Sequence, residues 1–156
     1  PPCGTSVLRL MKDELKRPSR KAGGGFYDYP DTGPKRLWKG LQKAFPPKSE
    51  QPDVEVLKRR FLYIQALETA RCYEEGVLTH PADADLGSVL GWSFPSWTGG
   101  TLSFIDTVGI QAFVAESDCL AKTYGLRFRP SAWLRARANR GEAFYETQFT
   151  EKSCAA

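Results

Sequence analysis

The segment "FLYIQAL", Phe61 to Leu67, constrains the fold more than any other part of this chain. It lies within a helical stretch that begins after Asp53, a good N-cap, and runs to about Glu75, with Gly76 as its stop. Successive helical side chains are rotated by about 100°, so the apolar residues of this segment point all round the helix axis. Such a helix is usually packed by neighbours on several faces. We therefore expect it at the centre of a helical fold.

The rest of the chain predicts shorter helices separated by glycine and proline. Alternation of apolar and polar residues is not sustained, so no strand is expected. The predicted fold class is all-α, an antiparallel helical bundle of about five to seven helices around the 53–75 helix. The expected shorter helices cover residues 6–17 with Thr5 or Ser6 as cap, 33–45, 83–91 with Asp83 or Asp85 as cap, 101–109, 109–125, and 131–141 with Ser131 as cap.

The length of 156 residues suits one domain or one long domain fragment. The net charge of +4 does not by itself imply a nucleic-acid partner. The positive charges are unevenly placed, however, because the stretch between Asp118 and Glu142 contains bases and no acid. This stretch is either a solvated helix face or a surface that meets an anion. The candidate anionic-partner surface consists of Arg127, Arg129, Arg135, Arg137 and Arg140.

The four cysteines are far apart and form no C-x-x-C pair, which argues against a zinc site. Cys72 and Cys119 fall inside expected helices, where we predict small buried hydrophobic residues. The pattern fits a reducing compartment, hence the cytoplasm, or a peroxisome or mitochondrion in a eukaryote. No apolar run is long enough to span a membrane. The chain starts without an initiator Met or a signal peptide, so we expect a fragment of a longer protein.

The stretch "RKAGGGFYDYPD", residues 20–31, raises the question of a phosphate-binding loop. A P-loop needs a Lys followed by Ser or Thr, and a dinucleotide fingerprint follows a strand. Neither context is present, because a predicted helix precedes the glycines and aromatic residues follow them. We interpret the stretch as a structural joint where the backbone turns through positive φ and aromatic rings hold the exit against a core. The joint comprises Gly23, Gly24, Gly25, Phe26, Tyr27 and Tyr29.

Few residues qualify for chemistry. The single histidine, His80, precedes a proline at a helix start, which is typical of a surface or capping residue. Asp83 and Asp85 are two apart and do not face each other on a helix, so capping explains them better than a paired acid and base. Glu68 lies near apolar residues on the helix projection and is predicted to be a buried polar anchor. We expect no catalytic, cofactor-binding or metal-binding residue in this chain.

Several motifs carry a family resemblance. The segment "RKAGGGFYDY" followed by "LWKGL" resembles the exit of the first C-terminal helical unit of 3-hydroxyacyl-CoA dehydrogenases. The segments "RFLYIQALETARCYEEGVL", "PADADLGSVLGWSFPSWTGG" and "FIDTVGIQAFVAESDCLAKTYGLRFRPSAWL" resemble the second such unit, as found in multifunctional fatty-acid oxidation complex alpha subunits. The resemblance covers residues 20–145. It implies that residues 1–45 are a remnant of the first unit with the joint and a short helix, 46–52 a linker, and 53–156 the second unit.

The resemblance also implies a function for the longer protein. Such parents oxidise 3-hydroxyacyl-CoA to 3-ketoacyl-CoA with NAD, often alongside an enoyl-CoA hydratase region. Their catalytic His–Glu pair lies in a Rossmann region that this sequence lacks. A further catalytic asparagine, from the first helical unit, aligns here with Arg59 when the family's E-A-x-R pattern is placed on Glu68 and Arg71. The asparagine is therefore absent, and the fragment alone is expected to be inactive.

We thus expect a region that serves packing, shapes the acyl-CoA cleft and makes subunit or interdomain contacts. Its partners would be the Rossmann region and first helical unit of the parent, the acyl-CoA substrate through the parent, and a second copy of itself through an exposed apolar face. The fragment itself needs no cofactor, and NAD belongs to the parent. The alternative is an autonomous basic module that binds CoA phosphates or nucleic acid through the basic stretch. Nucleic acid is the less favoured target, because aromatic residues do not alternate with the bases.

Overall fold

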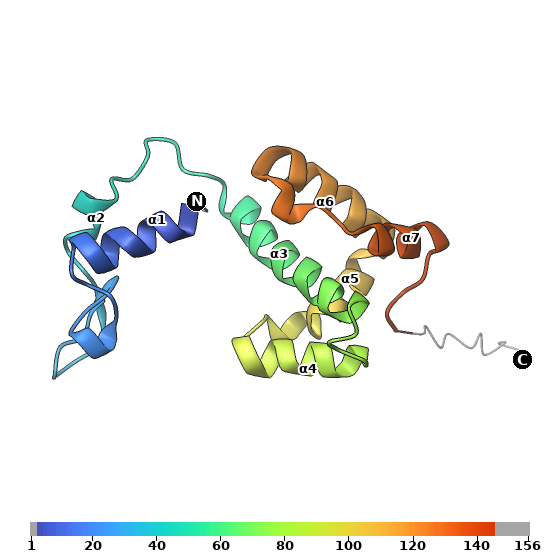
Figure 1. Cartoon of the computed structure of the whole chain (residues 1–156), viewed down its shortest axis with the longest axis horizontal. Helices are drawn as coiled ribbons and strands as arrows, with labels where there is room; N and C mark the ends of the chain where they lie inside the picture. Colours follow the sequence, from blue (N-terminus) through green and yellow to red (C-terminus); the bar gives the residue numbers. More distant parts are fainter. Residues whose placement is uncertain (1–2, 146–156) are drawn as a thin grey trace, which may run out of the picture. The chain divides into compact units, whose positions relative to one another are not determined.

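The computed structural model describes residues 3–145, most of which are helical (Figure 1). The chain divides into two compact units, Pro1–Gln51 and Pro52–Ala156, which we call unit 1 and unit 2. The all-α class predicted from the sequence is confirmed. One two-stranded sheet is the exception within the described part of the chain.

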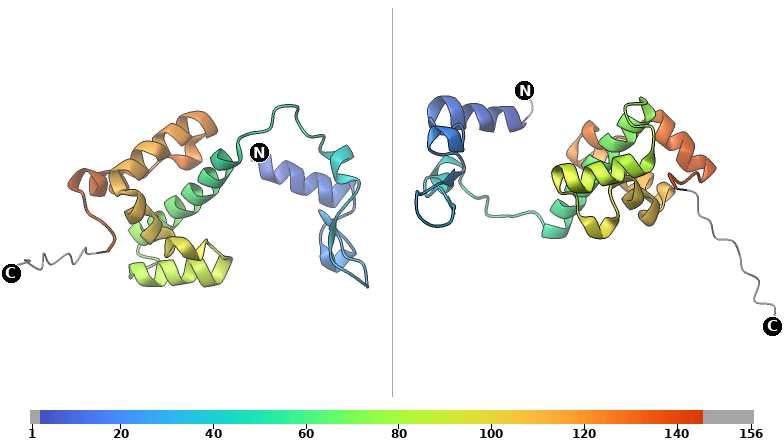
Figure 2. Two further views of the ribbon diagram at one scale, coloured as in Figure 1. Left: turned by 180° about the vertical axis from the view of Figure 1, so that it is seen from behind. Right: turned by 90° about the horizontal axis from the view of Figure 1, so that it is seen from below.

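Unit 2 is built on the helix α3 (Val54–Glu74), which occupies the expected central position. Helices α4, α5 and α7 contact α3, and α6 packs against α5 and α7. Figure 1 shows α4 on one side of α3 and α6 with α7 on the other, and Figure 2 shows α5 between α4 and α6. The other elements of unit 2 are α4 (Pro81–Trp92), η3 (Ser96–Thr98), α5 (Thr101–Val108), α6 (Ile110–Tyr124), η4 (Leu126–Phe128) and α7 (Ala132–Arg140).

The predicted ends of two helices are confirmed by their capping hydrogen bonds. The side chain of Asp53 accepts a hydrogen bond from the backbone N–H of Glu55 at 2.7 Å, at the start of α3. At the start of α7, Ser131 Oγ accepts one from the N–H of Leu134 at 3.1 Å. The helix α7 ends at Gly141, whose φ of +68° is the left-handed conformation that glycine adopts readily.

The start of α4 differs from the prediction. His80 occupies the N-cap position with an extended backbone, and Pro81 is the first helical residue. A proline suits that position because the N–H that it lacks would have no partner within the helix. Asp83 lies in the first turn and Asp85 one turn further on, so neither caps α4.

Aromatic rings form the core of unit 2 beside the middle of α3. Tyr63 stacks on Phe113 with centroids 4.5 Å apart, and meets Phe104 edge-on at 5.6 Å. Leu102 and Ile105 of α5 are completely buried next to them. Because each large apolar side chain contributes about 1.5–3 kcal/mol when buried, this cluster holds α3, α5 and α6 together.

The helix α3 packs against neighbours on several faces as expected, although Phe61 of its apolar run is 66% exposed. Two expectations about burial are wrong. Cys119 is exposed on α6, and Cys72 is half-buried on α3. Each of these side chains lies on a helix stripe that no neighbouring element of unit 2 covers completely.

Unit 1 contains the sheet that the sequence analysis missed. Tyr27 pairs with Leu37 in an antiparallel ladder, although residues 33–45 were expected to be helical. The N–H of Trp38 donates to the carbonyl of Phe26 at 3.0 Å, so tertiary pairing overrides the local helical pattern. Thr5 and Ser6, the two expected caps, both lie within the first helix, which begins at Cys3. The elements of unit 1 are α1 (Cys3–Arg9), the π-helical turn η1 (Leu10–Glu14), η2 (Arg20–Ala22), β1 (Tyr27–Asp28), β2 (Arg36–Leu37) and α2 (Leu41–Ala44).

Within residues 3–145, no helix combines the length and the apolar character that crossing a bilayer requires.

Candidate functional site

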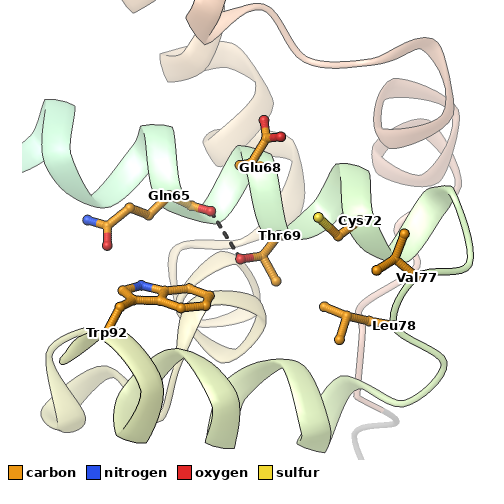
Figure 3. A pocket seen from close by; sticks show the side chains of 7 residues that line it. All are labelled: Gln65, Glu68, Thr69, Cys72, Val77, Leu78 and Trp92. Carbon is orange, nitrogen blue, oxygen red and sulfur yellow. Dashed lines mark hydrogen bonds between the residues drawn. The ribbon is translucent and has the colours of Figure 1, made fainter. Parts of the chain in front are cut away.

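An apolar groove lies between α3 and α4 of unit 2. Figure 3 shows Trp92 of α4 facing Gln65 and Thr69 of α3 across it. Its volume is 480 Å³, and Trp92 and Val77 on its walls are 52% and 70% exposed. The groove is lined by Gln65, Glu68, Thr69, Cys72, Val77, Leu78 and Trp92. A concave apolar surface of this kind is suited to packing against another apolar surface.

Glu68 is not the buried anchor that the sequence indicated. Its side chain is 63% exposed, and it forms an ion pair with Arg71 one turn further along α3. In Figure 3 its carboxylate points away from Trp92 and Leu78. The helix projection placed Glu68 beside apolar residues correctly, but it could not tell that the Glu68 side chain is left largely uncovered by residues 3–145.

The basic stretch is partly neutralised by ion pairs within unit 2. Arg135 donates two hydrogen bonds to the carboxylate of Asp118, at 2.7 Å and 2.5 Å. This contact lowers the pKa of Asp118 and raises the pKa of Arg135. Arg140 donates to Glu142 at 2.5 Å, which lowers the pKa of that carboxyl in the same way.

Arg137 is also engaged. Its Nη2 donates to the carbonyl of Ala143 at 2.6 Å, and its guanidinium lies 4.9 Å from the ring centroid of Phe144. Arg127 and Arg129 are exposed and have no ion-pair partner within residues 3–145. The candidate anionic-partner surface therefore offers two unpaired arginines, since the other three serve the fold of unit 2.

The glycine joint of unit 1 wraps around Arg17. The Arg17 side chain donates to the carbonyl of Gly25 at 2.9 Å and to the carboxylate of Asp28 at 2.5 Å. A Cβ at Gly24 would lie 2.6 Å from the guanidinium, so a larger residue there would have to displace the Arg17 side chain. Gly23 ends η2 with φ +88°.

The aromatic residues of the joint pack on cations and on one another. Tyr27 lies under Lys35 at 4.9 Å, and Tyr29 under Arg20 at 5.4 Å. Phe26 is 37% exposed and meets the ring of Phe45 at 6.4 Å. The prediction was that these rings hold the exit of the joint against a core. In the structure their contacts are with neighbouring cations and with Phe45 instead.

Asp85 holds a network that the sequence analysis did not identify. Its side chain is buried in α4, and its carboxylate accepts hydrogen bonds from the N–H of Leu102 at 2.7 Å and of Ser103 at 3.0 Å. It thereby caps α5, whose own N-cap, Gly100, has no side chain to do so. Asp85 was expected to cap the helix that contains it. It does cap a helix, but that helix is α5 and not α4. A glycine before "TLSF" is the only sequence signal that this cap must come from elsewhere.

The same network ties down the C-terminal end of the described chain. The hydroxyl of Tyr145 donates to Asp85 at 2.8 Å, and burial raises the pKa of Tyr145 to about 12. Asp106, at the end of α5, accepts hydrogen bonds from the N–H groups of Phe144 and Tyr145, each at 2.9 Å. Two carboxylates therefore fasten residues 144–145 to α4 and α5.

The residues considered for catalysis do not come together. Arg59, at the position of the family's asparagine, forms an ion pair with Glu116 at 2.9 Å, and this contact raises the pKa of Arg59. His80 has no side-chain capping contact at the start of α4. Among the described residues, no cluster of histidine, cysteine and acidic side chains is suited to a metal ion.

No family model matches the chain, but curated proteins do. The chain is 36% identical over 138 residues to a fatty acid oxidation complex subunit alpha of Vibrio cholerae, covering 87% of this chain and 19% of the relative. Proteins of the same name from Pseudomonas savastanoi and Vibrio vulnificus are 32% identical over 155 residues and 33% identical over 145 residues. These two matches cover 89% and 92% of this chain, and 20% of each relative.

The chain thus spans about one fifth of the length of the curated relatives that it matches. The matches confirm the resemblance found in the sequence motifs. The chain is a homologue, along most of its length, of one part of the fatty acid oxidation complex alpha subunits.

Proposed function

We propose that this chain is the C-terminal helical region of a fatty-acid oxidation complex alpha subunit, where it packs against other regions and performs no chemistry. The observation that carries the proposal is the match over most of this chain to about one fifth of each relative. The parent would oxidise 3-hydroxyacyl-CoA to 3-ketoacyl-CoA with NAD. In it, this region would help to shape the acyl-CoA cleft.

The division into units supports a more detailed assignment. Residues 1–45 would be the end of the first helical unit, 46–52 a linker, and 53–156 the second helical unit. The boundary between the two compact units falls between Gln51 and Pro52 of the sequence, inside that linker. The assignment gives the glycine joint a role, since it closes one unit before the chain passes to the next.

The residues of the joint do not fit NAD. The space that a nucleotide phosphate would need beside Gly24 and Gly25 is filled by the guanidinium of Arg17, which binds the Gly25 carbonyl and Asp28. The NAD of the parent would therefore be bound by its Rossmann region, outside this chain. Arg59, at the position of the family's asparagine, would likewise contribute no catalytic group, and its guanidinium pairs with Glu116.

The groove between α3 and α4 supports a contact role. An apolar surface with an exposed Trp92 gains free energy when another apolar surface covers it, about 25 cal/mol for each Å² removed from water. In the parent, the first helical unit or the Rossmann region would cover it. In the isolated chain, a second copy would do so.

Sedimentation of the isolated chain over a range of concentrations tests this role. We expect self-association that weakens in Trp92→Gln, because that tryptophan lines the groove. Trp97→Gln is the matched control, since Trp97 is 77% exposed and does not line the groove. A wild-type chain that stays monomeric at every concentration would contradict the contact role.

Two further observations test the assignment to the parent. Mixing the chain with acetoacetyl-CoA and NADH should give no loss of absorbance at 340 nm above background. Turnover would refute the non-catalytic role. Reading the genomic sequence upstream of Pro1 should reveal a G-x-G-x-x-G motif roughly two to three hundred residues earlier. A different upstream domain would refute the assignment.

A further inference from the structure

We propose that unit 2 carries a docking pocket for a polypeptide segment in which an apolar side chain stands next to a carboxylate. The pocket lies between the N-terminal half of α3 and the turn η4, away from the residues that line the α3–α4 groove. Its volume is 140 Å³. It is lined by Leu57, Arg60, Phe61, Ile64, Arg127 and Phe128.

Arg60 provides the first positive charge. Its guanidinium carbon lies 4.3 Å from the ring centroid of Tyr124, which fixes the plane of the group. Its Nε is buried and has no hydrogen-bond partner, and no carboxylate pairs with Arg60 in the described part of the chain. The adjacent Arg59, by contrast, is paired with Glu116. Arg60 is thus a pre-oriented donor group without an acceptor, an arrangement that favours binding of an anion.

Arg127 provides the second positive charge. It is exposed, it lines the same pocket, and it has no ion-pair partner among residues 3–145. It differs in this from Arg135, Arg137 and Arg140, all of which are engaged within unit 2. Arg60 and Arg127 both line this pocket, so one carboxylate bound there would bring a negative charge to two cationic side chains that lack an ion-pair partner among the described residues.

The size of the pocket limits its apolar occupant. An engineered protein cavity of about 150 Å³ holds benzene, so this pocket has room for one side chain the size of Leu or Phe. A CoA nucleotide is far larger. Phe61, which lines the pocket, is 66% exposed, and Leu126, which precedes Arg127 in η4, is 78% exposed, so exposed apolar side chains accompany the pocket. A small free acid would leave those side chains uncovered, and this favours a polypeptide as the occupant.

The inference rests on the proposed function for the origin of the segment. The relatives are about five times as long as the stretch that this chain matches, so the parent contains ample polypeptide outside it. The pocket gives the interdomain contact a chemical specificity that the α3–α4 groove lacks. A region presenting an acidic residue beside an apolar one would be fixed in one orientation.

Titration of the ¹⁵N-labelled 156-residue chain with the capped dipeptide acetyl-Leu-Glu-amide tests the pocket. We expect amide shifts confined to residues 57–64 and 126–128, with a dissociation constant on the order of a few millimolar. Acetyl-Leu-Gln-amide lacks the charge, and acetyl-Gly-Glu-amide lacks the apolar side chain. Each should bind about tenfold more weakly, because both parts of the ligand are recognised.

Variants locate the charge recognition. Arg60→Gln and Arg127→Gln should each weaken acetyl-Leu-Glu-amide about five- to tenfold, whereas Lys122→Gln, which removes the same charge outside the pocket, should leave it unchanged. Absence of shifts, equal binding of the neutral dipeptide, or tighter binding of free 4-methylpentanoate would overturn the proposal. None of these results depends on sedimentation or on the upstream sequence, so failure of the pocket and failure of the proposed function are distinguishable.

Discussion

Replacement of Gly100 by alanine probes how the start of α5 is held. Gly100 has φ +128°, which side-chain-bearing residues rarely adopt, and a Cβ there would lie 2.5 Å from the Cα of Asp85. The obstacle is backbone rather than the end of a flexible side chain. The α4 backbone would have to move, and this movement would pull the Asp85 carboxylate away from the amides of Leu102 and Ser103.

The expected loss of stability follows from three contributions. Backbone strain at an unfavourable φ costs about 1–3 kcal/mol. Overpacking in a filled site costs about 1–3 kcal/mol, and a weakened helix cap costs about 1 kcal/mol. These contributions overlap, so we expect Gly100→Ala to lower the free energy of unfolding by about 3–5 kcal/mol, and the melting temperature by at least about 12 °C.

Urea and thermal unfolding followed by circular dichroism at 222 nm measure this loss, because unit 2 contains most of the helix. Gly87→Ala is the matched control. Gly87 lies on the exposed side of α4, with no atom within 4 Å of a new Cβ, so alanine should stabilise the helix by about 0.5–1 kcal/mol. If Gly100→Ala melts within about 2 °C of the wild-type chain, the close approach of α4 to α5 is not as the structure shows.

Two other predictions concern the C-terminal fastening and the glycine joint. Burial raises the pKa of Tyr145 to about 12, so the folded state holds the phenolic proton more tightly than the unfolded state does. This stabilisation is complete below about pH 10 and is lost as the pH rises towards 12. Between pH 8 and pH 11 the melting temperature should therefore fall less in Tyr145→Phe than in the wild-type chain. An equal fall in both proteins would contradict the raised pKa. Gly24→Ala should displace the guanidinium of Arg17, which lies 2.6 Å from the new Cβ and packs over the ring of Trp38. Loss of that packing should speed hydrogen exchange of the Trp38 amide, which donates to the carbonyl of Phe26. Gly25→Ala, whose nearest atom would be 3.7 Å away, is the control, and equal exchange in the two variants would refute the crowding at Gly24.

The parts of the fold that the sequence predicted are those that local chemistry decides. Asp53 and Ser131 cap their helices by hydrogen bonds within three residues, and Gly141 ends α7 by its own backbone conformation. The residues that make such interactions are close together in the sequence, so a local pattern predicts them. The parts that it did not predict depend on partners far along the chain. Asp85 caps a helix 17 residues away, and β2 replaces helix because Trp38 pairs with Phe26.

The candidate surfaces show the same division. The basic stretch was visible as a run of arginines, but its ion pairs were not, because Asp118 lies 17 residues before Arg135. Removing the paired arginines from the stretch leaves Arg127 and Arg129, and the structure brings Arg60 of α3 to the pocket that Arg127 lines. No pattern in the sequence connects these two residues, which are 67 positions apart. Only the folded unit brings these two positively charged residues to one pocket.

The exposed side chains of α3 connect the fold of unit 2 with its proposed contact role. The apolar run of this helix predicted cover on several faces, yet Phe61 is largely exposed and Glu68 stands free of the core. On one side of the helix the uncovered surface continues into the Trp92 groove, and on another it borders the pocket of Arg60. A helix whose composition requires more cover than its own unit provides is the expected condition of one region of a longer chain. Under the proposed function, the other four fifths of a protein like the relatives would supply that cover, and it would attach at the groove and at the pocket.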